Sequence, residues 1–156
     1  FSITDGQLPS NAKAGYVIAP SICYESIYGE FMSRYVRNGA NIICIITNDG
    51  WWKNTPGHKQ HMNYARLRAI ETGTWVVRSA NTGISCFISP DGVVINPQPY
   101  DTQAAIKFVV PASASKTFYV RYGDVLSPVM CGIALLLLLW IIGLKIQNRF
   151  FSKKSS

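Results

Sequence analysis

One cysteine occupies a position that suits a catalytic nucleophile. Residues 16–22 (YVIAPSI) are apolar and typical of a β-strand, and residues 26–36 carry apolar side chains at helical spacing. Cys23 therefore lies at the junction between a predicted strand and a predicted helix. The partial positive charge at a helix N-terminus favours the reactive thiolate form of a nearby cysteine. The position predicts a nucleophile, but by itself it also fits a buried structural cysteine.

Glu25 follows Cys23 closely, in the first turn of the predicted helix. An acid there either compensates the helix dipole or orients and accepts protons beside the thiol, and its position alone does not decide between the two. The other three cysteines, Cys44, Cys86 and Cys131, lie in apolar runs, where a thiol usually packs as a small hydrophobic group. These three are therefore predicted to be structural.

Two histidines lie close together in the chain, but they do not form a recognisable metal motif. His58 and His61 have no further ligands of suitable type nearby, and the sequence contains no Cys-x-x-Cys pair. The sequence therefore predicts no metal site, and no cofactor is indicated.

A second group of candidate residues follows the predicted strand at residues 41–47 (NIICIIT). Ligands of open α/β sheets bind beyond the carboxyl ends of the strands, so the loop after this strand is a candidate part of the site. Trp51 and Trp52 in the loop either pack over the sheet, form an apolar wall for a substrate, or reach toward a membrane interface. Structural support of the site is predicted for four polar residues at the ends of this strand and the next: Asn48, Asp49, Arg78 and Asn81.

The order of strand-like and helical segments predicts an α/β protein. The predicted helices cover residues 26–36 and 58–71, and the predicted strands cover residues 16–22, 41–47, 75–80, 84–89, 93–96 and 105–110. Residues 90–92 (PDG) predict a hairpin turn. Strands alternating with helices, followed by further strands, predict a layered sheet whose later strands are antiparallel additions.

The uncharged run at residues 125–144 predicts a transmembrane helix. At about 1.5 Å rise per residue this run extends over roughly 30 Å, the thickness of the hydrocarbon core of a bilayer. The net charge is +7, from 15 basic and 8 acidic side chains, and the part of the chain after Asp124 holds four basic residues and no acid. The positive-inside rule then places the C-terminus in the cytoplasm and residues 1–124 on the opposite side. Little of the positive charge is left to support binding of nucleic acid.

Five short motifs together resemble the nitrilase, or carbon-nitrogen hydrolase, superfamily. They are ICYES at residues 22–26, TNDGWW at 47–52, HMNYARLRAIETG at 61–73, RSANTGIS at 78–85 and SPDG at 89–92. With the apolar run that follows, the chain resembles more narrowly the C-terminal part of the bacterial apolipoprotein N-acyltransferase family. The resemblance implies the C-terminal half of an α/β, nitrilase-like α-β-β-α sandwich, followed by one transmembrane helix.

The resemblance also implies how the chain is divided and where it lies. Residues 1–110 would be the C-terminal part of a periplasmic nitrilase-like domain, residues 111–124 a linker, residues 125–144 the transmembrane helix, and residues 145–156 a basic cytoplasmic tail. The whole protein would be a multi-pass protein of the bacterial inner membrane. Because position 1 is not Met, the chain is predicted to be a fragment of a longer protein.

The activity implied by the resemblance is transfer of a fatty acyl chain from a phospholipid to the N-terminal diacylglyceryl-cysteine of an apolipoprotein. Cys23 would be the nucleophile that forms a thioester, and Tyr24 and Glu25 would be the adjoining residues that support it. The predicted partners are therefore the phospholipid donor, the apolipoprotein acceptor and the membrane, without nucleic acid.

One part of the family pattern has no match in this chain. The family's catalytic triad is Glu-Lys-Cys, and its Glu and Lys lie upstream of the matched segment; Lys13, the one lysine before Cys23, lacks their surroundings. The fragment alone is therefore predicted to be inactive. Two other functions stay open at this stage: a membrane-tethered nitrilase-like amidase that passes its acyl group to water, and a non-catalytic module that binds lipid or lipoprotein.

Overall fold

The computed structural model describes residues 15–112 and 116–154, so Lys13 lies outside the described residues. The chain divides into two units, Phe1–Gly123 and Asp124–Ser156. The first unit contains the sheet and the candidate nucleophile. The second consists of one long helix.

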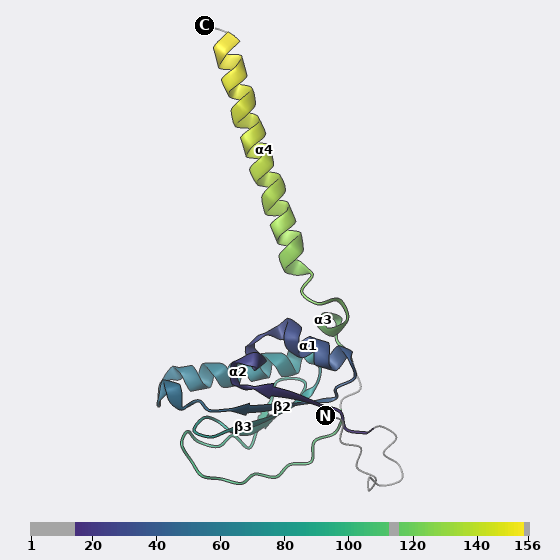
Figure 1. The fold of residues 1–156 in the computed structure, drawn as a ribbon, viewed down its shortest axis with the longest axis vertical. Helices are drawn as coiled ribbons and strands as arrows, with labels where there is room; N and C mark the ends of the chain where they lie inside the picture. The colour runs from purple at the N-terminus through teal and green to yellow at the C-terminus, as the bar shows by residue number, and fades with distance from the viewer. Residues whose placement is uncertain (1–14, 113–115, 155–156) are drawn as a thin grey trace. The chain divides into compact units, whose positions relative to one another are not determined.

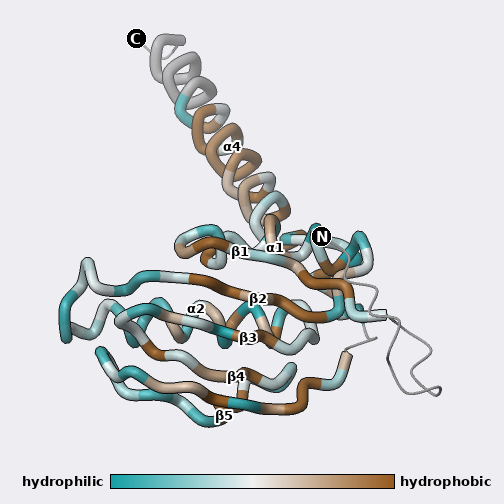
Figure 2. The backbone as a smooth tube through the Cα atoms, turned by 60° about the horizontal axis from the view of Figure 1, so that its bottom comes forward, coloured by the Kyte–Doolittle hydropathy of each residue, from teal (hydrophilic) through white to brown (hydrophobic). Residues whose placement is uncertain are grey.

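The described residues of the first unit form one five-stranded sheet whose strands follow chain order (Figure 2). The strands are β1 (Ile18–Ile22), β2 (Ile42–Thr47), β3 (Trp75–Ala80), β4 (Cys86–Ile88) and β5 (Val94–Ile95). The first three strands are parallel, and β4 and β5 join as antiparallel additions. Ile22 pairs with Ile46 and Thr47 with Ala80, so the carboxyl ends of the parallel strands meet at one edge of the sheet. The prediction of an α/β sheet with antiparallel later strands is confirmed.

Two helices cover one face of this sheet (Figure 1): α1 (Gly29–Arg37) and α2 (Pro56–Thr72). The limits of α2 follow from local chemistry. Thr55 is the N-cap and its hydroxyl accepts a hydrogen bond from the Gly57 amide, Pro56 occupies the first helical position, and Gly73 ends the helix at a left-handed φ of 63°. The helix predicted at residues 58–71 is therefore confirmed, with slightly wider limits.

The hydrophobic core lies between the sheet and these two helices. Side chains on a strand alternate between faces, and those facing the helices are fully buried, as at Ile43, Ile45 and Val76. The opposite face of β2 is more open, since Ile46 is 63% exposed. The face of β2 toward the helices is therefore buried in the core, whereas its opposite face is partly exposed.

The first predicted helix is split in two. Residues 23–27 form a short 3-10 helix, η1 (Cys23–Ile27), and α1 begins only after Tyr28, which has extended backbone angles. Within η1 the Ser26 hydroxyl donates to the Cys23 carbonyl at 2.8 Å. Side chains that hydrogen-bond to nearby backbone compete with regular helix, which explains the break. The thiol consequently lies at the start of a tight turn and not directly at the N-terminus of an α-helix.

One prediction for residues 105–124 is corrected by the structure, and the segment also contains a helix that the sequence does not predict. Residues 105–110 form no strand; instead the Phe108 ring lies 5.5 Å from the Trp75 ring and 5.3 Å from the Phe87 ring, so this segment contributes a side chain to the sheet face and no backbone ladder. The predicted linker contains a short helix, α3 (Phe118–Tyr122). Its Val120 is fully buried, which a short mixed segment does not reveal by periodicity.

The second unit contains α4 (Leu126–Lys154), together with Asp124, which accepts a hydrogen bond from the Ser127 amide at 3.1 Å. Among the described residues one helix is long and apolar enough to cross a membrane, and it is the stretch Leu126–Lys145 of α4. The helix continues beyond the predicted end at residue 144, because the basic residues that follow are compatible with helix.

Candidate active site around Cys23

Cys23 lies directly after the carboxyl end of β1 and has a left-handed backbone, with φ of 51°. This conformation costs an L-residue other than glycine about 1–2 kcal/mol, because Cβ approaches the following carbonyl oxygen. Strained residues of this kind gather at functional sites. The side chain is half-buried, so the turn presents a thiol that is neither enclosed in the core nor fully in solvent.

Two hydrogen bonds hold the turn around Cys23. The Ser26 hydroxyl donates to the Cys23 carbonyl at 2.8 Å, and a carboxylate oxygen of Glu25 accepts the Ile22 amide proton at 2.7 Å. Ser26 is fully buried, whereas Glu25 is exposed. The structure therefore places the Glu25 carboxylate on the backbone of its own turn.

His61 of α2 packs against this turn. Its Nε2 is 3.3 Å from the Ser26 hydroxyl oxygen, and its Nδ1 is 2.9 Å from a carboxylate oxygen of Asp49. The Tyr24 ring stacks on the imidazole, with ring centres 5.3 Å apart and planes inclined by 17°. His61 is only 2% exposed. One buried imidazole thus contacts two of the three residues that follow Cys23.

Asp49 and Arg78 form a buried ion pair behind His61, and both side chains are fully enclosed. The Thr47 hydroxyl donates to Asp49 at 3.0 Å, and Arg78 Nε donates to the Ile84 carbonyl at 3.1 Å. Burial by itself raises the pKa of the Asp49 carboxyl, but the hydrogen bond from His61, the charge of Arg78 and the Thr47 hydroxyl together lower that pKa below its usual value. Asp49 is therefore an ionised acceptor at neutral pH.

The other predicted support residues lie at the rim of this cluster. The Asn48 side-chain oxygen accepts hydrogen bonds from the Gly50 amide at 3.1 Å and from the Thr82 hydroxyl at 2.9 Å, so it ties together two loops at the carboxyl edge of the sheet. Asn81 is exposed and takes part through its backbone, whose amide donates to the Thr47 carbonyl at 3.0 Å. Asp49 and Arg78 are thus inside the cluster, while Asn48 and Asn81 order the loops around it.

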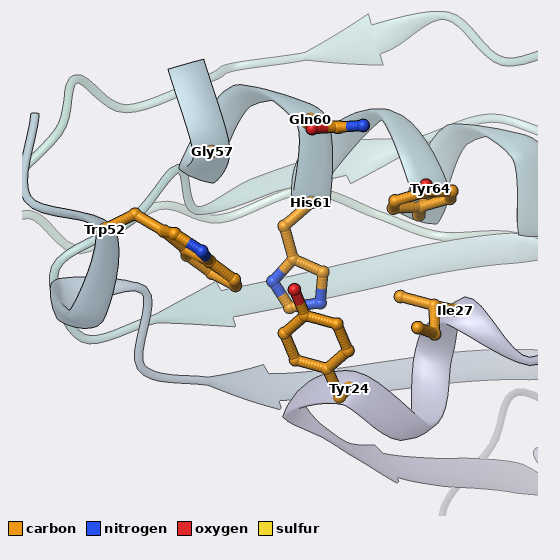
Figure 3. Close-up of a pocket in the computed structure, with 7 residues that line it drawn as sticks. All are labelled: Tyr24, Ile27, Trp52, Gly57, Gln60, His61 and Tyr64. Carbon is orange, nitrogen blue, oxygen red and sulfur yellow. The ribbon is translucent and has the colours of Figure 1, made fainter. Parts of the chain in front are cut away.

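The two tryptophans have different positions. Trp51 is 83% exposed, whereas Trp52 is half-buried and lies against Gly57, where an added methyl group would be 2.6 Å from the indole ring. Figure 3 shows Trp52 and Tyr24 on two sides of His61. A pocket of about 130 Å³ opens here, lined by Tyr24, Ile27, Trp52, Gly57, Gln60, His61 and Tyr64.

All four cysteines are free thiols, and burial separates the half-buried Cys23 from the fully buried Cys86. Cys86 is fully buried, and this burial raises the pKa of its thiol to about 11 although the charge of Arg78 acts in the opposite direction. Burial also raises the pKa of Cys44. The Cys131 side chain is exposed on α4, within the stretch that is long and apolar enough to cross a membrane. Cys44 is half-buried, on the face of the sheet away from the helices.

His61 and Ser26 were not predicted as part of the site. The sequence places His61 in the motif at residues 61–73 and finds no metal motif around it, but gives it no role in the site; in the structure it lies on the buried face of α2 with Ala65 and Arg68. A polar residue on the buried face of a helix needs a partner, which here is Asp49. The partner itself comes from another part of the chain, so only the tertiary structure identifies it.

Comparison with known proteins shows which family and which proteins the chain resembles. Residues 4–112 match the carbon-nitrogen hydrolase family. The chain is 43% identical over 119 residues to the apolipoprotein N-acyltransferase of Bradyrhizobium diazoefficiens, which covers 76% of this chain and 22% of that protein. It is 35% identical over 135 residues to the apolipoprotein N-acyltransferase of Pasteurella multocida, which covers 86% of this chain and 25% of that protein. The chain therefore spans about a quarter of the length of these curated relatives.

Two solved structures also resemble the chain. A carbon-nitrogen hydrolase from Helicobacter pylori G27 has a TM-score of 0.49 at 13% identity, over 55% of this chain and 37% of that one. An amidase from Nesterenkonia sp. has a TM-score of 0.47 at 17% identity, over 56% of this chain and 35% of that one. Because the family match covers more than half of the sequence, the chain belongs to the carbon-nitrogen hydrolase family, and it is similar to apolipoprotein N-acyltransferases.

Proposed function

We propose that this chain carries the nucleophile of an N-acyltransferase that moves a fatty acyl chain from a phospholipid to the N-terminal diacylglyceryl-cysteine of an apolipoprotein. The observation that carries the proposal is Cys23 itself: a half-buried thiol in a strained, hydrogen-bonded turn at the carboxyl edge of the sheet. The names of the curated relatives supply the substrate class.

The proposed reaction has two steps. In the first, a general base takes the Cys23 proton, the thiolate attacks the ester carbonyl of the phospholipid, and the C–O bond breaks as the lysophospholipid leaves with a proton. In the second, the amine of the apolipoprotein attacks the thioester, the C–S bond breaks, and the thiol is regenerated as the amide forms. A thioester reacts with an amine more readily than the original ester does, so two easier steps replace one difficult exchange.

The general base and the oxyanion-stabilising lysine are assigned to no residue of this chain. Glu25 is the acid nearest to Cys23 in the sequence, but its carboxylate accepts the Ile22 amide proton, so we assign it support of the turn. We assign the same supporting role to Tyr24, whose ring is held on His61. The chain by itself is therefore expected to form no acyl-enzyme.

Exposed aromatic and apolar side chains around the turn fit a lipid substrate. Trp51 is 83% exposed, and Tyr28 and Phe31 are partly exposed beside a surface hollow of about 400 Å³ that also includes Glu25. Amphipathic rings such as those of tryptophan and tyrosine favour the interface between membrane and water. We propose that Trp51 and Trp52 contact the lipid substrate near Cys23.

The helix α4 fits the same proposal. Its stretch Leu126–Lys145 would cross the inner membrane of a bacterial cell, and the basic residues that follow would keep the C-terminus in the cytoplasm. The sheet unit would then lie in the periplasm. Both proposed substrates are held in the bilayer, so an enzyme attached to the membrane meets them without diffusion through solvent.

The experiment is an acyl-transfer assay with the full-length gene product, a phospholipid donor and a diacylglyceryl peptide acceptor. Cys23→Ala should abolish transfer, because no neighbouring group replaces the thiolate. Cys86→Ala is the matched control: it removes a fully buried thiol and should retain transfer, with a loss of stability of about 1–3 kcal/mol. A folded Cys86→Ala protein as inactive as Cys23→Ala would refute the choice of nucleophile.

The same assay separates the alternative functions. Phospholipid without acceptor should leave one acyl chain on the Cys23 peptide, and neutral hydroxylamine should remove it as expected for a thioester. Release of free fatty acid in place of transfer to the peptide would indicate a hydrolase. Binding of lipid or peptide without any turnover would indicate a non-catalytic module, and the proposal would then be abandoned.

A further inference from the structure

The contacts of His61 go beyond what packing of α2 against the sheet requires. Nε2 lies 3.3 Å from the Ser26 hydroxyl oxygen, and Nδ1 lies 2.9 Å from a carboxylate oxygen of Asp49. The Tyr24 ring stacks on the face of the imidazole. His61 therefore joins the buried Asp49–Arg78 ion pair to the turn that presents Cys23. Figure 3 shows its ring beside that of Tyr24.

The Ser26 hydroxyl is shared between the turn and the histidine. A serine hydroxyl has one proton, and Ser26 donates it to the Cys23 carbonyl at 2.8 Å, the shorter of its two contacts. The Ser26 oxygen also lies 3.3 Å from Nε2 of His61, while Nδ1 lies 2.9 Å from Asp49 and 3.4 Å from Nη2 of Arg78. A line of polar contacts thus runs from the Asp49–Arg78 ion pair through His61 and Ser26 to the Cys23 carbonyl.

A strained turn persists only when its surroundings determine it. Cys23 has a left-handed φ of 51°, and its carbonyl accepts a hydrogen bond from the Ser26 hydroxyl. His61 contacts that hydroxyl and so helps to fix its orientation. Without the contact at Nε2, the Ser26 hydroxyl is free to rotate away, and the turn can relax toward an ordinary backbone conformation.

We infer that His61 is a positioning residue for Cys23, acting through Ser26 and Tyr24, and that the contact of its Nε2 with the Ser26 hydroxyl is the essential feature. The inference rests on the proposed function only for its catalytic consequence. The structural consequence, an ordered turn at residues 22–26, holds whatever reaction Cys23 performs.

Two substitutions at His61 separate its two nitrogens. The His61→Gln side-chain amide can reach the position of Nε2 and contact the Ser26 hydroxyl, whereas the His61→Asn amide is shorter and reaches only the position of Nδ1, beside Asp49. Ser26→Ala removes the hydroxyl that links His61 to the Cys23 carbonyl and leaves the sequence of α2 unchanged. His58→Asn is the matched control, because His58 is also 2% exposed on α2 but its ring packs at a tilt against Tyr100, with ring centres 4.6 Å apart.

The experiment measures amide hydrogen exchange of the peptide covering residues 22–28 in the full-length gene product, together with kcat and KM for acyl transfer. His61→Asn and Ser26→Ala should speed exchange in this peptide about tenfold and lower kcat about tenfold, with KM for the acceptor nearly unchanged, as expected for loss of one hydrogen bond that orders the turn. His61→Gln should keep both values within about threefold of the original protein. His58→Asn should change neither exchange in this peptide nor kcat.

The outcomes are distinguishable. Equal effects of His61→Asn and His61→Gln, or unchanged exchange in Ser26→Ala, would overturn the positioning role. If His61→Asn fails to fold, Ser26→Ala decides alone, since it removes only a hydroxyl. Altered exchange in the expected variants of a protein that transfers no acyl group would refute the proposed function and leave the positioning role standing.

Discussion

Removing the charge of Asp49 should be among the most damaging single changes to the sheet unit. Asp49→Asn preserves the shape of the side chain but leaves the Arg78 guanidinium buried without a counter-charge. It also replaces an acceptor of hydrogen bonds from Thr47 and His61 with a group that donates as well as accepts. Loss of one partner of a buried pair costs about 3–5 kcal/mol. The hydrogen bonds from Thr47 and His61 to the charged carboxylate contribute about 1.5–3 kcal/mol each, so weakening both leads to a similar loss in the free energy of unfolding.

The measurement is the free energy of unfolding from urea titration, followed by tryptophan fluorescence. Asp91→Asn is the control, because Asp91 is an exposed carboxylate on the Ser89 hydroxyl and its loss should leave stability close to the original value. The double variant Asp49→Asn/Arg78→Met should be clearly more stable than the sum of the single losses predicts, since it leaves no unpaired charge. Additive losses would refute the reasoning.

The pH dependence of stability gives an independent check on Asp49. Its pKa is lower in the folded protein than the ordinary value, so its ionised form stabilises the fold above the ordinary pKa of an aspartate, about 3.9, and this stabilisation is lost as pH falls through the folded-state pKa. Asp49→Asn should therefore reduce the loss of stability on acidification. An unchanged acid profile in this variant would show that Asp49 is not the group responsible.

Three further predictions follow from other parts of the structure. Gly83→Ala should destabilise the protein by about 1–3 kcal/mol in urea unfolding, because the added Cβ would lie 2.1 Å from a carboxylate oxygen of Asp49; an unchanged midpoint would contradict this packing. Cys86 should resist iodoacetamide at pH 7.5 while Cys23 reacts, since burial raises the pKa of Cys86 to about 11; equal labelling by peptide mass spectrometry would argue against the difference in burial. A membrane-impermeant reagent should label Lys53 from the periplasm while a reporter at the C-terminus reads as cytoplasmic, and finding both on one side would remove the membrane assignment.

The sequence alone identified the parts of the fold that depend on local pattern. The apolar, β-branched run at residues 41–47 predicts a strand buried on both faces; β2 forms there, although Ile46 is 63% exposed. Gly73 marks the end of α2 through its left-handed backbone. The place of Cys23 at a strand end is likewise visible without coordinates. Each of these features depends on residues within a few positions of one another.

The tertiary structure decided which distant side chains meet. Asp49, His61 and Arg78 come from a loop, a helix and a strand, respectively. The sequence pattern of one element does not indicate which residues of the other two it will contact. Their contact requires the parallel register of β2 with β3, which places Thr47 beside Ala80, and the packing of α2 across that edge. The left-handed turn at Cys23 is similar, since backbone strain there is offset by contacts from α2. Local sequence determines the elements, but burial of polar groups is satisfied only between elements, and that is why the site could not be derived from sequence alone.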